Sequence, residues 1–357
     1  MAGEIWNHAV ALKNRYYKLF GKGLPKARLQ AHLARLRNRN KIHWRTVGSQ
    51  SVQAIADRLY LGWEAFFKGD IKRPPTFRAR RKYRSFTLKQ AGYQLLGYGR
   101  LRLLGRNYRF NQSRPVAGTI KTVTVRRDAI GDVYVTFSCE GVPQPDQAPK
   151  TGLSAGADFG LKDFLTLSTG ERIAAPQPFK GALRHFRKAQ RLLSRKQKGS
   201  NARNKSRLAV ARLHRRAANL RADWQWKTAR DLVRRFDVIT IEDLSVIGMS
   251  KLWGRKVADL AMGDFARRLA HQAHKAGKTL ARYPRFSRST GVCPLCRAEH
   301  KLDLRERSFR CCGRTWDRDQ AAALILDEAG RSLGPGAGVR PLEQIRRQPA
   351  LVTAESH

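Results

Sequence analysis

The stretch Val238-Ile239-Thr240-Ile241-Glu242-Asp243-Leu244 decides the fold class of this chain. Its first four residues are apolar or β-branched, a pattern that predicts a short strand buried on both faces. Two carboxylates follow at the carboxyl end of that strand, where α/β sheets carry their chemistry. The stretch therefore predicts a multidomain α/β protein with an acidic site at one edge of a sheet.

Two other segments place an aspartate in a comparable setting. Ala155-Gly156-Ala157-Asp158-Phe159-Gly160 predicts a strand of small residues, and Trp316-Asp317-Arg318-Asp319-Gln320-Ala321 leads into a helix rich in Ala, Leu and Ile. Buried carboxylates need a partner that offsets their desolvation. Asp158, Glu242 and Asp319, three such acids in a very basic chain, indicate a site for divalent metal ions. The alternative is that one or two of them cap a helix or pair with arginine.

The charge of the chain indicates a polyanionic partner. Its 357 residues suffice for two or three modules, and a hydrophobic share of 41% suffices for folded cores. Lysine and arginine number 72 against 27 acids, a formal charge of +45 whose self-repulsion opposes compaction. Nucleic acid is therefore expected ahead of a membrane surface, since the sequence has neither a long apolar run nor an N-terminal signal-peptide pattern.

The first 70 residues are expected to be helical. Two apolar faces at helical spacing predict this: Trp6, Val10, Leu12, Tyr16 and Tyr17, then Ala54, Leu59, Leu61, Trp63, Phe66 and Phe67. Ser49-Gln50-Ser51 offers an N-cap to the second helix. On its first turns, Gln53 either reads an adenine edge in a DNA groove or is a solvated surface residue, and the sequence alone favours the surface.

Residues 71–140 are expected to form a small basic β-barrel. Lys72-Arg73-Pro74-Pro75 marks its boundary, and no acidic residue occurs from position 71 to 127. Strands are predicted at 85–88, 100–104, 119–127 and 133–137, the last two joined by a hairpin turn at 128–132. A tract without acids favours a phosphate-binding face over an ordinary solvated surface. Cys139 is expected to be a plain core thiol.

A linker rich in Pro, Gln and Asp is predicted at 141–150, and an RNase H-like domain follows it. Three strands at 153–159, 164–168 and 172–173, followed by helices, are how that fold begins, with its first acid on the first strand. A helix at about 257–276 that stops at Gly277, then a fifth strand at 279–283, would complete the sheet.

A basic helical hairpin is predicted between the two halves of this sheet, because Asp and Glu are absent between Glu171 and Asp223. Its helices are indicated by Leu183, Phe186, Leu192 and Leu193, then by Leu208, Leu213, Ala217, Leu220 and Trp224. An apolar stripe on an otherwise basic hairpin suits contact with a nucleic-acid backbone. The candidate contacts are Arg195, Lys196, Lys198, Arg203 and Lys205.

Four of the five cysteines lie within twenty residues, which predicts a metal site and a reducing cytoplasm. Cys293-Pro294-Leu295-Cys296 has the spacing at which two thiolates share a tetrahedral zinc ion. A zinc ribbon normally has a second such pair, but here Cys311 and Cys312 stand side by side. Either both reach the ion through a distorted turn, or His300 replaces one of them.

These motifs, in this order, resemble the TnpB family of transposon-encoded RNA-guided DNA endonucleases, which are related to the type V CRISPR effectors. The resemblance covers about residues 5–326 and is densest at 156–162, 193–200, 241–244 and 289–296, then at Cys312-Gly313 and Asp317-Arg318-Asp319. It implies that Asp158, Glu242 and Asp319 are a RuvC-type catalytic triad for two Mg²⁺ ions. It also implies that Cys293, Cys296, Cys311 and Cys312 bind Zn²⁺.

The resemblance further implies a domain order and partners. Residues 1–70 are a helical recognition lobe, 71–140 a wedge barrel that holds guide RNA, and 141–150 a linker. Residues 151–288 and 314–329 are the two parts of the RuvC-like nuclease, 289–313 the zinc-ribbon insert that binds target nucleic acid, and 330–357 a flexible tail. The implied partners are guide RNA, target double-stranded DNA and its displaced strand, in a prokaryotic cytoplasm near the nucleoid. Gln53 falls near where the family reads a short motif beside the target.

The chain departs from the family pattern in three places. It lacks an initial Tyr-Arg-Leu-Tyr-Pro segment, so one barrel strand is expected to be missing. Its second zinc knuckle is contracted to Cys311-Cys312, and Ala321 stands where the family has Asn. These departures favour one alternative, an RNA-guided repressor that binds DNA without cutting it. A DNA transposase and a ribosome-like RNA-binding protein with a zinc ribbon are the remaining alternatives.

Overall fold

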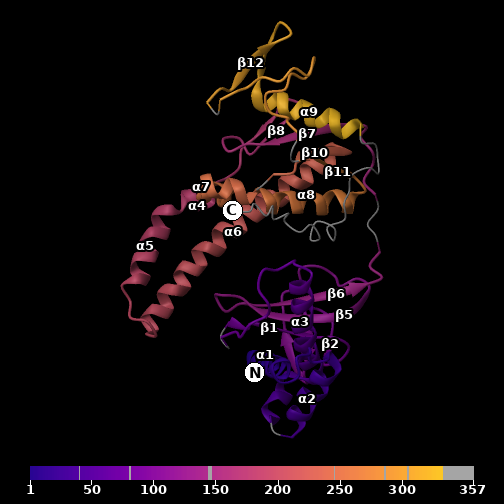
Figure 1. The fold of residues 1–357 in the computed structure, drawn as a ribbon, viewed down its shortest axis with the longest axis vertical. Helices are drawn as coiled ribbons and strands as arrows, with labels where there is room; N and C mark the ends of the chain where they lie inside the picture. Colours follow the sequence, from indigo (N-terminus) through magenta and orange to yellow (C-terminus); the bar gives the residue numbers. More distant parts are fainter. Residues whose placement is uncertain are drawn as a thin grey trace. The chain divides into compact units, whose positions relative to one another are not determined.

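The computed structural model describes residues 1–39, 41–79, 82–143, 147–244, 246–284, 287–303 and 305–332. These residues fall into two compact units, one within 1–143 and one within 147–332 (Figure 1). The predicted tail from position 333 on and positions 144–146 of the predicted linker lie outside the described residues. Within the described ranges, no helix has the length and apolar character needed to cross a membrane.

Helices make up the start of the first unit, as predicted. They are α1 (Ala2–Phe20), α2 (Lys26–Asn38), the 3-10 helix η1 (Ile42–Val47) and α3 (Ser49–Phe67). Trp6 and Trp44 are fully buried in their shared core. The predicted cap is wrong, because Gly48 precedes α3 and no side chain caps it. Leu61, assigned to an apolar face, is exposed because it lies two positions from buried Leu59 and so on the opposite side of the helix.

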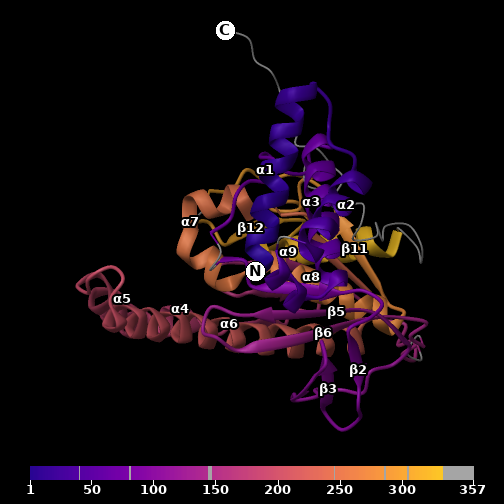
Figure 2. The same cartoon turned by 90° about the horizontal axis from the view of Figure 1, so that it is seen from below.

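Two antiparallel sheets form the rest of the first unit. One has the order β1-β5-β6 (Ser85–Leu88, Thr119–Arg127 and Val133–Glu140), and the other the order β2-β3-β4 (Tyr93–Leu95, Arg100–Leu103 and Arg106–Arg109). Figure 2 shows β2 and β3 extending away from β5 and β6. A small core that includes Leu88, Leu101 and Val123 joins the two sheets. The four predicted strands are confirmed, but hydrogen bonding divides the strands of residues 82–143 between two sheets and does not close a single barrel.

A five-stranded sheet with the order β11-β10-β7-β8-β9 organises the second unit. β7 (Ser154–Phe159), β8 (Leu165–Leu167) and β9 (Arg172–Ile173) are antiparallel neighbours. β10 (Val238–Glu242) runs parallel to both β7 and β11 (Thr279–Tyr283). The five strands predicted for this part of the chain are confirmed, and the buried centre of β10 agrees with a strand covered on both faces.

Helices cover both faces of this sheet. α6 (Asn201–Arg235) and α8 (Met262–Ala276) pack on one face through apolar residues such as Leu232 and Phe265, while α9 (Arg318–Ser332) lies on the other (Figure 1). After the short α4 (Pro178–Gly181), α5 (Leu183–Ser194) and α6 form a hairpin that extends away from the sheet (Figure 1).

The single helix predicted at about 257–276 is wrong. α7 (Val246–Leu260) and α8 are separate helices, because Ala261 adopts a left-handed φ of 48° between them. Alanine rarely adopts this conformation, so no sequence signal marked the break.

Candidate active site and metal centre

Two adjacent parallel strands bring the first two predicted acids together. Ile241 of β10 pairs with Ala157 of β7. The next residue along each strand is an acid, Glu242 on β10 and Asp158 on β7, and both strands run in the same direction. The two carboxylates therefore lie on neighbouring strands near their carboxyl ends, the position at which an acidic site was predicted.

The third acid, Asp319, is in the first turn of α9, and Gly156 sets how closely α9 approaches β7. A β-carbon at Gly156 would lie 2.5 Å from the backbone nitrogen of Asp327 and still closer to the carbonyl oxygen of Ala323. Non-bonded carbon atoms need about 3.5–4.0 Å, so only glycine fits here. The small-residue strand thus places a helix backbone directly on the sheet and brings Asp319 to the edge that carries Asp158.

We expect Gly156→Ala to destabilise the second unit by at least about 3 kcal/mol, because α9 has to move away from β7. The shift is measured as the urea midpoint of unfolding. Gly181→Ala is the matched control, since a β-carbon at Gly181 meets nothing within 4 Å. Equal midpoints for the two variants would contradict this packing.

Asp158 is buried, and its pKa is raised well above that of an ordinary aspartate. Burial is the largest cause, and repulsion by Glu242 and then by Asp319 adds to it, while Arg318 acts in the opposite direction. The three predicted acids are therefore close enough to interact electrostatically. Such a group favours a proton or a cation among its carboxylates.

The other two acids each have a defined partner. Glu242 accepts a hydrogen bond from the hydroxyl of Ser289, a residue that is 3% exposed. Oδ1 of Asp319 lies 3.1 Å from Nε of Arg318, and Oδ2 lies 3.7 Å from Nη1 of Arg307. Among the described residues, the three acids do not form a group whose oxygens all lie within 4.8 Å of one another. They are neighbours in an open arrangement, with Asp319 held by arginine.

Asp317 has a role that the sequence analysis did not assign. Its Oδ1 accepts hydrogen bonds from the backbone N–H groups of Asp319 (3.2 Å) and Gln320 (3.0 Å), which caps α9. Its Oδ2 lies 2.8 Å from Nη2 of Arg172 on β9. An aspartate just before a helical run is a cap signal that could have revealed this role. Asp243, the second acid of the opening stretch, lies instead 3.7 Å from Arg282.

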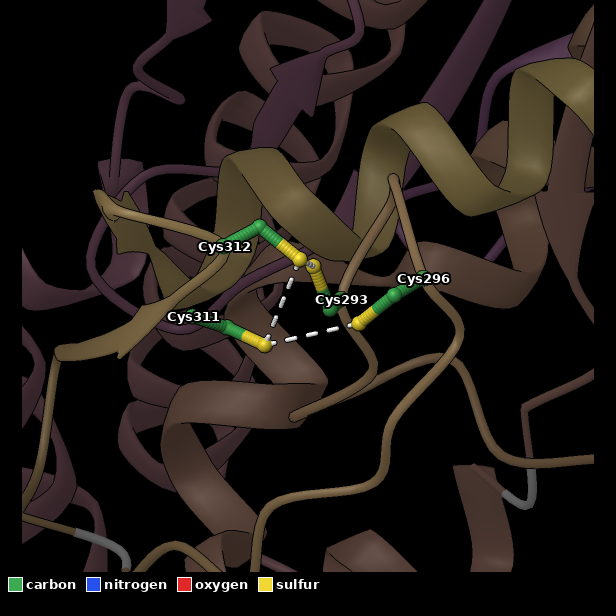
Figure 3. A group of neighbouring side chains, drawn as sticks. All are labelled: Cys293, Cys296, Cys311 and Cys312. Atoms are coloured by element: carbon green, nitrogen blue, oxygen red, sulfur yellow. Dashed lines mark hydrogen bonds between the residues drawn. The ribbon is translucent and has the colours of Figure 1, made fainter.

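The four clustered cysteines converge on one point (Figure 3). Their Sγ atoms all lie within 4.8 Å of one another. Sγ–Sγ distances are 4.0 Å for Cys293 and Cys312, 3.5 Å for Cys296 and Cys311, and 3.8 Å for Cys311 and Cys312. Four thiolates about 2.3 Å from a tetrahedral zinc ion would lie roughly 3.8 Å apart. The cluster therefore has the spacing of a four-thiolate metal site.

A tight hairpin explains how adjacent cysteines both reach the cluster. Cys312 and Gly313 form the two-residue loop between β12 (Ser308–Cys311) and β13 (Arg314–Asp317). Both have positive φ, 51° and 70°, as in a type I′ turn. Both cysteines therefore reach the cluster, as one alternative predicted, but through a regular type I′ turn and not a distorted one. His300 is not part of the cluster, since its ring packs on Phe309 with 4.8 Å between centroids.

The thiols of the cluster differ in acidity. Burial raises the pKa of Cys293, but hydrogen bonds from the backbone N–H groups of Cys296 and Leu295 outweigh it and lower that pKa to about 7. Hydrogen bonding with the Cys296 thiol, then burial, raises the pKa of Cys311 to about 12, and the Cys296 thiol also raises the pKa of Cys312. Several thiolates at this spacing are compatible only with a bound cation, which fits a metal centre.

The predicted nucleic-acid contacts of the second unit lie around the turn between α5 and α6. Arg195, Lys196, Lys198 and Lys205 are exposed there. Arg203 is different, because its Nη1 donates to the carbonyl oxygens of Leu193 (2.9 Å) and Lys196 (2.7 Å). Its guanidinium thus closes the turn through Nη1.

Other sequence assignments of the hairpin and the first unit have mixed outcomes. Leu192 and Leu220 were assigned to the apolar stripe but are exposed, 46% and 52%. Gln53 is exposed on α3, beside a cavity of about 270 Å³ that Gln30 and Arg37 also line. Cys139 is half-buried on β6.

Comparison with known proteins places these features in a family. A family model described as "Probable transposase" matches residues 136–252, and one described as "Cas12f1-like, TNB domain" matches residues 263–326. A candidate RNA-guided DNA endonuclease of Streptomyces pristinaespiralis is 35% identical over 244 residues, 67% of this chain and 60% of that protein. InsQ of Escherichia coli K12, a candidate of the same description, is 27% identical over 330 residues, 86% of this chain and 80% of that protein.

The fold points in the same direction. In a cryo-EM structure of a Cas12f1–sgRNA–target DNA complex, the matching chain has a TM-score of 0.55 at 12% identity, over 91% of this chain and 80% of that chain. The protein therefore has the fold of a Cas12f1-like effector. With the two family models and the relatives, this confirms the resemblance inferred from the motifs, and the chain belongs to the TnpB family. It spans 60% of the Streptomyces relative.

Proposed function

We propose that this protein is a transposon-encoded RNA-guided DNA endonuclease of the RuvC type, with Asp158, Glu242 and Asp319 as its catalytic acids. It would cut target DNA next to a short flanking motif. The observation that carries this proposal is the meeting of acids from β7, β10 and α9 at one edge of an α/β sheet. A buried aspartate whose pKa is raised by burial and by two neighbouring acids, as that of Asp158 is, is typical of a functional carboxylate site.

The donor set fits Mg²⁺, because hard divalent cations prefer carboxylate oxygens. Bound ions would supply activation of the attacking water and stabilisation of the departing 3′ oxygen. Asp158 is central, since Glu242 and Asp319 both act on its pKa. The four cysteines would hold one Zn²⁺, and a site with four protein ligands is structural because it leaves no position open for substrate.

The basic surfaces would bind the nucleic-acid backbones. The exposed lysines and arginines around the α5–α6 turn, and the acid-free tract of residues 71–127, present positive charge without neighbouring carboxylates in the sequence. By family resemblance, guide RNA would occupy the first unit, and base pairing with that RNA would select the target.

The proposal is tested with purified ribonucleoprotein and a plasmid that matches the RNA that co-purifies with it. We expect Mg²⁺-dependent linearisation of the matched plasmid and none of an unmatched one. A protein that shifts the plasmid but never cuts it is the repressor, an alternative that Ala321 favours. Site-specific cutting that survives RNase treatment would establish a transposase instead.

The α5–α6 turn offers a matched pair of variants. We expect Lys205→Ala to weaken nucleic-acid binding and reduce the slope of log affinity against log salt by about 1, with little change in melting temperature. Arg203→Ala should lower the melting temperature, because two carbonyl groups lose their donor. Binding by filter retention and melting by calorimetry distinguish the two roles, and identical behaviour of both variants would contradict the assignment.

A further inference from the structure

The four-cysteine insert, residues 289–313, contacts the acidic site through the first residue of the insert, Ser289. Ser289 precedes Cys293 by four positions and is almost completely buried. Its hydroxyl donates to Oε1 of Glu242 on β10, 47 positions earlier in the chain. A buried hydroxyl that donates to a carboxylate restricts the rotation of that side chain.

The insert has two arms, one that leads from Ser289 to Cys296 and one that leads from Glu306 to Cys312. The second arm contacts α9. The backbone N–H of Arg318 donates to the carbonyl oxygen of Arg307 at 2.8 Å, and Nη1 of Arg318 donates to the carbonyl oxygen of Glu306 at 3.0 Å. Arg318 is the first residue of α9 and directly precedes Asp319. These hydrogen bonds fix the start of the helix from which Asp319 projects.

The cysteine cluster joins the two arms. Cys293 follows Ser289 by four positions, and Cys311 follows Arg307 by four positions. The sulfur atoms of the two arms lie 3.5 Å and 4.0 Å apart in the pairs Cys296–Cys311 and Cys293–Cys312. A cation held by the cluster would therefore cross-link the arms four residues along the chain from where each contacts an acid or its helix.

We propose that the four-cysteine insert positions two of the three acids, and that Ser289 is the positioning residue of Glu242. The inference rests on the proposed function and deepens it. The insert, which the family resemblance assigns to target binding, is also part of the framework of the cation site. Without the Ser289 hydroxyl, Glu242 is free to rotate away from Asp158, and divalent cations bind less tightly.

Ser289→Ala in the full chain tests this inference without any cutting assay. Mn²⁺ serves as the probe, and free Mn²⁺ is measured by electron paramagnetic resonance in the absence of nucleic acid. Because groups that orient metal ligands typically change affinity 10–100-fold, we expect at least about 10-fold weaker Mn²⁺ binding with unchanged zinc content. Ser308→Ala, which removes the same atom from an exposed position of the insert, should bind Mn²⁺ like the wild type.

A double-mutant cycle tests the coupling to the cluster. In a Cys312→Ser background the insert is no longer cross-linked, so Ser289→Ala should have little further effect on Mn²⁺ binding. An equal effect of Ser289→Ala in both backgrounds, or no effect in either, would overturn the inference.

The outcomes also separate this inference from the proposed function. If the wild type never cuts a matched plasmid but Ser289→Ala weakens Mn²⁺ binding, the positioning role of Ser289 is supported and the proposed nuclease function is refuted. If the wild type and Ser289→Ala cut equally at every Mg²⁺ concentration and bind Mn²⁺ equally, the proposed nuclease function is supported and the positioning role of Ser289 is refuted.

Discussion

Asp158→Asn is expected to lower cutting by at least about 1,000-fold, a loss of about 4 kcal/mol of transition-state stabilisation. The amide cannot supply the charge that a divalent cation requires at the centre of the site. Binding of guide RNA and target should persist, because the basic surfaces are untouched. Plasmid cleavage and gel shift, measured on the same preparation, check both expectations.

The same variant should stabilise the metal-free protein at neutral pH. The pKa of Asp158 is raised in the folded chain, mainly by burial and then by Glu242 and Asp319. The folded state therefore binds this proton more tightly than the unfolded chain, whose aspartate pKa is about 4. The resulting stability is complete below that pH and is lost as pH rises through the raised pKa. Asparagine does not ionise, so the variant does not lose this stability as pH rises. The melting temperature of the variant should therefore exceed that of the wild type by more as the pH increases.

Asp223→Asn is the control, since its carboxylate is exposed on α6 and pairs only with Lys227 in the described structure. It should cut and melt like the wild type. Mg²⁺-dependent cutting that persists in Asp158→Asn would refute the catalytic assignment. A melting temperature that falls at every pH would show that Asp158 makes a net favourable contribution to the fold.

Cys293→Ser is expected to abolish zinc binding and unfold the insert. Cys293 is buried, and structural zinc sites supply about 10–16 kcal/mol of binding free energy that is also folding free energy. Since whole domains are stable by only about 5–15 kcal/mol, the insert should not hold its shape without the ion. Elemental analysis should fall from one zinc per chain to none, and limited proteolysis should cut within residues 289–313.

Cys139→Ser is the matched control for this substitution, because Cys139 lies on β6 in the other unit. It should retain one zinc per chain. Full zinc content in Cys293→Ser would show that the cluster is not the zinc site.

Sequence patterns predicted the sheet of the second unit because its strands have strong local signals. The run of β-branched residues in β10 and the small residues of β7 both require burial on two faces. β2 and β4 were missed, since a segment such as Arg106–Arg109 is fully exposed and has no apolar alternation. The break at Ala261 was missed because alanine favours helix, and tertiary packing overrides that preference here.

The acidic site was predictable only in part. Carboxylates at the ends of predicted strands and at the start of a predicted helix marked Asp158, Glu242 and Asp319, but their partners come from elsewhere in the chain. Ser289 and Arg172 belong to other elements, and no local pattern in the sequence connects them with Glu242 or Asp317. The Cys312-Gly313 turn did carry a local signal, since glycine at the second position of a two-residue loop is typical of a type I′ hairpin.

The position of α9 in the chain has a consequence during translation. Asp319 belongs to the last helix of the described residues, and α9 docks on β7, a strand made about 160 residues earlier. A nascent chain that has already released its basic first unit from the ribosome still lacks one of the three acids. Under the proposed function, RNA bound by the first unit would therefore be engaged before the site that cuts DNA is complete.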